Sequence, residues 1–207
     1  MTVAQLKSTS PEHVTVVFDD GSELRSTLNV ITDCRLYSGL ELDEERLEEL
    51  RVSSERALGF EYASGLLSRR QYSMKELHDR LVKKGLGEDI AAYCVRHMTE
   101  NGLMDDGSYA SAVARHYTAK GYGAGRIRSE LSKRGVSREL WDESLEDIPA
   151  NTDKVDRFIA VRLKDPDDPN QVRRVIAALQ RRGFSYTEIR EALSRFSAGA
   201  DIEEEYI

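Results

Sequence analysis

The apolar residues of the chain recur at helical spacing over most of its length. From Asp43 onward they stand three or four positions apart, which is the spacing of one face of an α-helix. Asp43 suits the N-cap of the first such helix, because the acidic residues after it complement the positive end of the helix dipole. A short apolar group between Leu28 and Tyr37 allows one further helix before it. The pattern therefore predicts a mainly helical protein.

One segment near the N-terminus has a different pattern. Residues 12–27 read EHVTVVFDDGSELRST, in which a β-branched run meets Asp-Gly and then a shorter run of polar and apolar residues. This is the local chemistry of a tight β-hairpin. We predict no other β-structure, and we expect residues 1–58 to form an N-terminal extension that contains this hairpin and a helix.

The chain contains an internal repeat. The segments SMKELHDRLVKKG, AGRIRSELSKRG and NQVRRVIAALQRRG end at Gly85, Gly135 and Gly183, which are about 50 residues apart. Each segment has a leucine four residues before its glycine and basic residues directly before it. Such a glycine suits the left-handed position at the end of a helix, where cations complement the carbonyl end of the dipole. We predict that each segment is a helix capped by its glycine.

Two further helices fit around each of these segments, one before it and one after it. The apolar stripes before the segments are Ala63, Leu66 and Leu67, then Ala110, Val113 and Tyr117, then Val155, Phe158 and Ile159; those after the glycines are Ile90, Cys94 and Met98, then Leu140, Leu145 and Ile148, then Ile189, Leu193 and Phe196. Ser73 with Glu76, and Ser185 with Glu188, have the spacing of capping boxes. We therefore predict three helices per repeat.

Repeats of this size cannot bury their apolar faces alone, so neighbouring repeats should stack. We expect an all-α fold in which tandem three-helix repeats form an elongated, curved array. The predicted repeats are residues 59–104, 105–152 and 153–200, followed by an acidic tail at 201–207. Asp153–Lys154 and Asp165–Asn170 are the expected connectors, the second because Pro166 and Pro169 break helices there.

The formal net charge of -7 is unevenly distributed along the chain. Acidic residues gather at 41–49, at 165–168 and in the tail, whereas residues 115–138 contain seven cations and a single acid, Glu130. Such a basic segment can meet phosphates or an acidic protein face.

Aromatic residues accompany this basic segment. Arg126, Lys133 and Arg134 lie near Tyr117 and Tyr122 in the sequence. Cations beside aromatic rings are what single-stranded nucleic acid binding uses, because rings stack on bases while cations neutralise phosphates. The alternative is a solvated helix surface without a ligand.

No arrangement typical of a catalytic or metal site occurs. The chain has neither a GxxxxGK[ST] phosphate loop nor an HExxH motif. We interpret Gly121–Gly125 as the flexible start of a helix, with approach of its amides to a phosphate as the alternative. Cys94, His97 and His78 lack the second Cys/His pair that a metal site needs, and Asp105–Asp106 suits a helix N-terminus better than a catalytic carboxylate pair. We expect no catalytic residues, no metal and no cofactor, and hence a protein that is not an enzyme.

The remaining composition fits a folded intracellular protein. The hydrophobic content of 40% is enough for a core, and Cys34 and Cys94 give no disulfide framework, so we expect both to be reduced. No basic start followed by a long apolar run occurs, and no apolar run reaches the roughly 18 residues that a membrane helix needs. We expect a cytoplasmic monomer that does not enter the membrane.

Three stretches of the chain resemble a known family. SMKELHDRLVKKG, GLMDDGSYASAVARHY and KGYGAGRIRSELSKRGV, in this order, are similar to the signature stretches of the RecX family of recombination regulators. The resemblance covers about residues 60–196, and it is most specific from GLMDD to RGV. The N-terminal hairpin segment lies outside it.

The resemblance implies three tandem three-helix repeats that bind RecA filaments on single-stranded DNA. Members of the family typically inhibit ATP hydrolysis and strand exchange by RecA, in DNA repair, homologous recombination and the SOS response, and some bind DNA themselves. Carried onto this chain, the implied interface with RecA or DNA is basic, and it comprises Lys83, Lys84, Lys120, Arg126, Arg128, Lys133, Arg134, Arg181 and Arg182.

Two other classes of function remain open from the sequence. The chain could be a single-stranded DNA-binding module that acts without RecA, which would give a DNA affinity that falls steeply with salt. It could also be a structural helical-repeat adaptor for another protein, which would affect neither DNA nor the recombinase.

Overall fold

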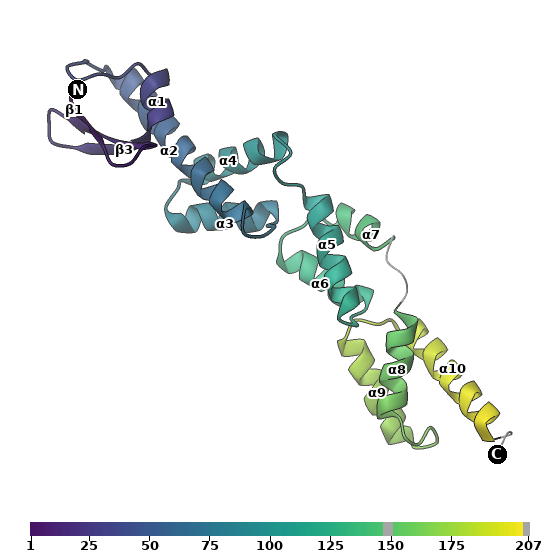
Figure 1. The fold of residues 1–207 in the computed structure, drawn as a ribbon. Coiled ribbons are helices and arrows are strands. Elements are labelled where there is room, and N and C mark those ends of the chain that lie inside the picture. The colour runs from purple at the N-terminus through teal and green to yellow at the C-terminus, as the bar shows by residue number, and fades with distance from the viewer. Residues whose placement is uncertain (147–150, 205–207) are drawn as a thin grey trace. The chain divides into compact units, whose positions relative to one another are not determined.

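The computed structural model describes residues 1–146 and 151–204, with side chains up to residue 197 (Figure 1). Within these residues the chain forms ten helices and three strands. Contacts divide it into two compact units, residues 1–105 and 106–207. The mainly helical fold with a small β-structure near the N-terminus confirms the predicted fold class.

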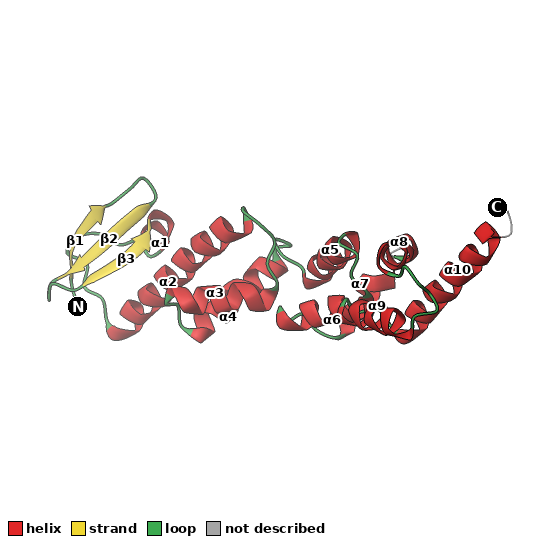
Figure 2. Ribbon diagram, turned by 90° about the horizontal axis from the view of Figure 1, so that it is seen from below, coloured by secondary structure: helices red, strands yellow, loops and turns green. Residues whose placement is uncertain are grey.

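The first unit begins with a three-stranded antiparallel sheet in the order β1-β2-β3, whose strands lie side by side in Figure 2. The strands are β1 (Val3–Ser8), β2 (His13–Phe18) and β3 (Glu23–Thr27). The predicted hairpin is confirmed as β2 and β3, joined by a turn in which Gly21 has φ +83°. Strand β1 was not predicted, because only Val3 and Leu6 of this strand turn toward the core and the segment shows no clear alternation.

Two helices cover the inner face of the sheet. They are α1 (Leu28–Asp33) and α2 (Glu44–Leu67), capped by the side chains of Thr27 and Asp43. Sheet and helices share an apolar core that includes Val16, Phe18, Ile31 and Leu50. Inside it the Ser54 hydroxyl donates to the Ser26 hydroxyl at 2.8 Å, so the two buried polar groups satisfy each other.

Helix α2 belongs to two cores at once. Its first half packs on the sheet, and its second half packs on α3 (Met74–Lys84) and α4 (Glu88–Glu100). The separate helices expected near Asp43 and Ala63 are therefore one helix of 24 residues. The predicted end of the N-terminal extension, between residues 58 and 59, lies inside it.

The first three-helix repeat is α2, α3 and α4. Its core is formed by residues of the predicted stripes and of α3, which are Ala63, Leu77, Leu81, Cys94 and Met98. The predicted capping box of Ser73 and Glu76 is confirmed, and Gly85 caps α3 in the left-handed conformation, with φ +107°.

The second unit contains the other two repeats. One consists of α5 (Asp106–Ala119), α6 (Ala124–Lys133) and α7 (Glu139–Glu146), and the other of α8 (Thr152–Arg162), α9 (Pro169–Arg181) and α10 (Tyr186–Glu204). Their cores are centred on Ile127 and Leu131 and on Ile159, Leu179 and Ile189. Three helices per repeat, as predicted, are confirmed.

Several predicted details of the second unit change. The Asp153–Lys154 connector was wrong, because both residues lie in the first turn of α8, whereas the Asp165–Asn170 connector is confirmed as far as Asp168, the N-cap of α9. Helices α6 and α9 end one residue earlier than predicted, so Gly135 and Gly183 follow the C-caps, with φ of +70° and +90°.

Two predicted features lie partly outside the described residues. Ile148 is not among them, and neither are residues 205–207 of the predicted acidic tail. The first part of that tail, residues 201–204, continues helix α10.

The close approach of α2 to its neighbours makes a test of packing in the first unit. A methyl group on Gly59 would come within 2.6 Å of the Leu86 side chain and 2.8 Å of the Cys94 sulfur. We expect Gly59→Ala to lower the free energy of unfolding by about 1–3 kcal/mol, because the added carbon overpacks a filled core. Gly65 of the same helix has open space around it, so Gly65→Ala should instead raise stability by up to about 1 kcal/mol. Urea unfolding of both variants measures this, and equal effects would contradict the packing argument.

Candidate functional site

The basic segment of residues 115–138 is organised by one buried carboxylate. The Glu130 side chain is only 8% exposed and forms ion pairs with Arg126 at 2.9 Å, with Lys133 at 3.3 Å and with Arg134 at 2.5 Å. The Tyr117 hydroxyl of α5 donates to the same carboxylate at 3.1 Å. Three of the predicted interface cations are thus paired with one buried acid, although the Lys133 side chain remains 61% exposed.

This environment keeps the Glu130 carboxylate ionised. Hydrogen bonds from Arg134, with further ones from Tyr117 and Lys133, lower the pKa of Glu130 from 4.5 to about 2. Their effect exceeds that of burial, which acts in the opposite direction. The carboxylate is therefore ionised throughout the neutral range, and it ties α6 to α5.

The two tyrosine rings of the basic segment already contact arginines of the protein itself. The rings of Tyr117 and Tyr122 lie 5.6 Å apart, with the Arg134 guanidinium 5.7 Å from the first and those of Arg126 and Arg182 at 5.9 and 5.8 Å from the second. The cation–aromatic pairing expected from the sequence is thus present in space. It is internal, however, so the structure gives no support to these two half-buried rings as platforms for bases.

The glycine-rich run joins two repeats. Helix α6 begins after Gly123 without a capping side chain. Instead, the N–H of Gly123 donates to the Arg182 carbonyl and the N–H of Gly125 donates to the Gly183 carbonyl, both at 2.9 Å. A methyl group on Gly123 would come within 2.5 Å of the Gly183 oxygen.

The interpretation of this run as a flexible helix start therefore needs correction. It is a helix start, but one packed against the turn between α9 and α10. Because the Gly123 and Gly125 amides are bonded to carbonyl groups, they are not available to a phosphate, so the phosphate alternative loses these two donors.

Side chains from α8 reinforce the same junction. The Asn151 amide donates to the carbonyls of Thr118 and Tyr122, each at 3.1 Å. The Lys154 ammonium donates to the carbonyls of Thr118 and Ala119 at 2.9 and 2.8 Å. These carbonyls close the C-terminal end of α5, where a cation also complements the helix dipole. The two repeats of the second unit are therefore joined by backbone hydrogen bonds and by side chains that donate to backbone carbonyls.

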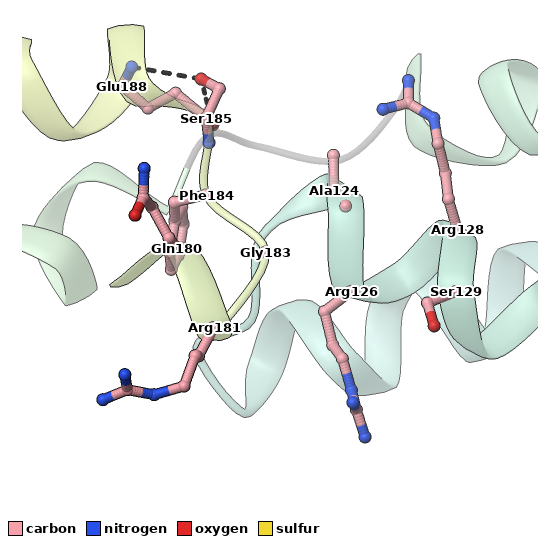
Figure 3. A pocket seen from close by; sticks show the side chains of 11 residues that line it. Ala124, Arg126, Arg128, Ser129, Gln180, Arg181, Gly183, Phe184, Ser185 and Glu188 are labelled. Atoms are coloured by element: carbon pink, nitrogen blue, oxygen red, sulfur yellow. Dashed lines mark hydrogen bonds between the residues drawn. The ribbon is translucent and has the colours of Figure 1, made fainter. Parts of the chain in front are cut away.

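An open groove of about 680 Å³ lies beside the junction, between the start of α6 and the α9–α10 turn (Figure 3). Arg126, Arg128 and Ser129 line it from α6, and Gln180 and Arg181 line it from α9. In Figure 3 the side chain of Arg126 extends downward and that of Arg181 to the lower left, whereas Arg128 extends upward. Three of the nine predicted interface cations therefore line one groove.

The charged side chains of the groove differ in the partners that they already have. Arg128 pairs at 2.8 Å with Asp142, whose side chain is 78% exposed. Arg181 is exposed and has no ion pair among the described residues. The acid that lines the groove, Glu188, is committed to the predicted capping box, because its carboxylate accepts from the Ser185 amide and hydroxyl, each at 2.7 Å. The groove is therefore predominantly cationic.

The other predicted interface cations lie elsewhere. Lys120 is exposed after the end of α5, and Lys83 and Lys84 are exposed at the end of α3 in the first unit. The Arg182 guanidinium lies 4.7 Å from the centre of the Phe158 ring and contacts the Gly121 carbonyl at 3.5 Å, so it serves the repeat junction.

Sequence reasoning missed the uncharged members of the groove, such as Ser129 and Gln180. No local signal distinguishes Ser129 or Gln180 from other helix surface residues. The usable signal for the groove is the set of glycines at 123, 125 and 183, since three residues without side chains allow two backbones to meet.

The remaining candidates are structural where they are described. Cys94 is fully buried in the apolar stripe, where burial raises the pKa of its thiol, and His97 packs 4.6 Å from the Phe60 ring. Among the described residues no group of three or more His, Cys, Asp or Glu could hold a metal ion. Asp106 is the first residue of α5, as predicted for a helix start. In the part of the chain that the structure describes, no helix is both long and apolar enough to cross a membrane.

Comparisons with known proteins identify all three repeats. Models of the first, second and third three-helix domains of RecX match residues 60–98, 105–145 and 160–193. The chain is 36% identical over 133 residues to the "Regulatory protein RecX" of Xanthomonas axonopodis pv. citri, covering 63% of this chain and 82% of that protein. It is 34% identical over 145 residues to the protein of the same name from Halorhodospira halophila, covering 68% of this chain and 86% of that protein.

Two solved structures share the fold. One, "Crystal structure of regulatory protein RecX", has a TM-score of 0.72 and 18% sequence identity, and the match covers 92% of this chain and 98% of that one. The structure of RecX from Lactobacillus salivarius has a TM-score of 0.63 and 20% identity, over 70% of this chain and 97% of that one. At these identities the likeness concerns the fold.

The depressed pKa of Glu130 predicts a pH-dependent contribution to stability. Because the folded state binds this proton less readily than the unfolded state, the contribution is complete above the ordinary pKa of 4.5 and is lost as the pH falls toward 2. It amounts to about 3 kcal/mol at neutral pH. Urea unfolding should therefore find Glu130→Gln less stable than the parent by about this amount at pH 7, with the difference shrinking below pH 4.5. A difference independent of pH would refute the assignment, and Glu143→Gln, at an exposed carboxylate of α7, should change little at any pH.

The repeat junction predicts unequal effects of one substitution at two helix ends. Gly85 and Gly183 both have positive φ, but Gly85 has open space around it whereas a methyl group on Gly183 would overlap the backbone nitrogen of Arg126. Alanine at either position strains the backbone by about 1–2 kcal/mol. Gly183→Ala should cost about 1–3 kcal/mol more, because it also separates α6 from the α9–α10 turn. Faster hydrogen exchange at the Gly123 and Gly125 amides in this variant checks the mechanism, and their unchanged protection would contradict it.

Proposed function

Because the chain belongs to the RecX family of regulatory proteins, we propose that it binds RecA filaments on single-stranded DNA and inhibits their ATP hydrolysis and extension. The proposal is supported by the presence of all three RecX three-helix domains, in order, within one chain. That chain covers 82% and 86% of the length of relatives named regulatory proteins.

We propose a regulator without catalysis of its own. The charged groups of the groove are guanidinium groups and one carboxylate that is already hydrogen-bonded, and this set offers neither a general base nor a nucleophile. Binding to a filament fits such a protein, because a filament presents the same surface many times. Modest contacts from several repeats then add up to avidity. The expected setting is the cytoplasm, in DNA repair, homologous recombination and the SOS response.

Exposure and ion pairing support a narrower set of interface cations. Cations that are exposed and lack a buried partner can contact a filament at little cost, and they are Lys83, Lys84, Lys120, Arg128 and Arg181. The other four, Arg126, Lys133, Arg134 and Arg182, already bind Glu130 or the repeat junction. We propose the first group as contacts and the second mainly as support for the surface, with Arg126 belonging to both roles through the groove.

The proposed function predicts inhibition at low stoichiometry. When the protein is titrated into RecA from the same organism on single-stranded DNA, ATP hydrolysis should fall well before the two proteins reach equal concentration, because one bound regulator affects many protomers of a filament. Hydrolysis that stays constant up to equal concentrations would contradict the proposal and favour the adaptor reading.

The basic end of α3 predicts which surface of the first unit contributes. Lys83→Glu with Lys84→Glu should raise the concentration needed for half-inhibition about tenfold, equivalent to about 1.4 kcal/mol of binding free energy. The matched control is Arg51→Glu with Arg69→Glu, which makes the same change in charge at exposed cations of α2 and its C-terminal end. Thermal unfolding checks that both double variants are folded. Equal inhibition by both would remove Lys83 and Lys84 from the interface.

A further inference from the structure

We propose that strand β3 pairs with β3 of a second copy of this chain, with Glu23 of each strand opposite Arg25 of the other, so that two N-terminal sheets join edge to edge. The strands lie in the order β1-β2-β3, so β1 and β3 form the two edges of the sheet (Figure 2). The matched models of the RecX domains begin at residue 60, so the sheet lies outside them. The proposal therefore goes beyond the function proposed for the repeats.

The other edge of the sheet, β1, is partly covered by the chain itself. The Val3 N–H donates to the Leu40 carbonyl at 2.9 Å, and the Gly39 N–H donates to the Val3 carbonyl at 2.8 Å. The second half of β1 contains Lys7, and two such strands paired about this residue would bring two lysines together. A covering segment and an exposed lysine are common means of protecting an edge strand from other chains.

The bonding pattern of the β2–β3 hairpin determines which peptide groups of β3 face outward. At the turn, the Phe18 N–H donates to the Ser22 carbonyl at 2.9 Å. Hydrogen-bonded pairs alternate with open pairs along an antiparallel ladder, so every second residue after Ser22 bonds to β2. In β3 these residues are Leu24 and Ser26, and the residues between them direct their peptide groups away from β2.

The outward peptide groups belong to Glu23 and Arg25. Among the described residues, the backbone N–H and carbonyl groups of these two residues have no hydrogen-bond partner. Both side chains are exposed, and β3 contains no proline and no register shift against β2. The next outward residue, Thr27, is the N-cap of α1. Two N–H groups and two carbonyls therefore form an open edge, which is a template for a strand of another chain.

This open edge is complementary to itself. When Leu24 lies opposite Leu24 of the second copy in an antiparallel pair, each Glu23 lies opposite an Arg25. Each of these two pairs exchanges two hydrogen bonds, so all the open groups of both strands are satisfied. Leu24 packs at the margin of the sheet core, so the two leucines extend that core across the joint.

The side chains in this register also match in charge. Each Glu23 carboxylate meets an Arg25 guanidinium of the other copy, and opposite charges directly across two strands stabilise the pair. Arg25 has no ion pair among the described residues, and Glu23 remains 55% exposed although it lies 3.3 Å from the Lys7 ammonium. A register shifted so that Arg25 meets Arg25 would instead place like charges together. The charges therefore favour a second copy and select its register.

The pairing is weak in dilute solution. A stable dimer buries roughly 1,200–2,000 Å², whereas two strand segments of three residues bury far less. We expect a dissociation constant on the order of 100 μM. The monomer expected from the sequence is then the form present at low concentration.

A filament would favour the pairing, a consequence that rests on the proposed function. Copies bound near one another have an effective concentration of about 1 mM, which exceeds the expected dissociation constant. Pairing of their sheets would then make binding to the filament cooperative.

Sedimentation equilibrium of the full chain tests the pairing. Over concentrations of about 5–500 μM, which bracket the expected dissociation constant, the average mass should rise from that of a monomer toward that of a dimer. Arg25→Pro removes an outward N–H without breaking a bond to β2, so it should weaken dimerisation at least about tenfold. Thermal unfolding checks that this variant is folded.

An exchange of charges tests the register. Arg25→Glu places glutamates opposite glutamates and Glu23→Arg places arginines opposite arginines, so each variant alone should dimerise at least about tenfold more weakly than the parent. An equimolar mixture of the two variants should regain dimers, because every pair across the joint then combines a glutamate with an arginine. Arg51→Glu, with the same charge change on an exposed part of α2, should dimerise within about twofold of the parent.

Three outcomes would overturn the proposal. The parent could stay monomeric at the highest concentration, or its dimers could persist in folded Arg25→Pro, which would mean that another surface forms them. In the third, the mixture of the two charge variants stays as monomeric as each variant alone. Because none of these measurements contains recombinase, their failure leaves the proposed regulation of RecA to be decided by the ATP hydrolysis assay.

Discussion

The second unit of the molecule depends on two backbone hydrogen bonds between repeats. In the other two repeats, the capping side chains of Ser73 and Ser185 accept from amides in the first turns of α3 and α10. At the start of α6 the carbonyls of Arg182 and Gly183 take this role, which requires that no side chain stand at Gly123 or Gly183. The same contact sets the two walls of the groove, so the position of its arginines follows from a constraint on the glycines.

Glu130 shows why the net charge of a sequence segment is a poor measure of the charge available at its surface. The sequence between residues 115 and 138 has a large excess of cations. Three of them gather on one buried carboxylate, and a tyrosine hydroxyl completes its shell. Fewer cations than the sequence suggests are therefore left to bind a partner. One of them, Arg181, lies outside the basic segment.

Much of the fold follows from local patterns in the sequence, and less of the site does. Helix periodicity, the capping boxes and the three repeat glycines are local signals, and the predicted three-helix repeats are confirmed in the structure. Strand β1 and the continuity of α2 depend on contacts across the first unit, which no local period records. For the site, the sequence analysis identified the arginines. It also predicted that they form an exposed binding surface together with Tyr117 and Tyr122. The structure shows these rings closed by their own cations, because folding brings guanidinium groups from two repeats onto them.

The continuity of α2 fixes a rotational relation inside the first unit. Leu50 faces the core of the sheet and Ala63 faces the core of the first repeat, and a single uninterrupted helix connects them. Each residue of a helix turns the chain by about 100°, so one inserted or deleted residue between these two positions would swing one of the two faces out of phase with its core. The number of residues between Leu50 and Ala63 can therefore change only by steps that restore the phase of both faces.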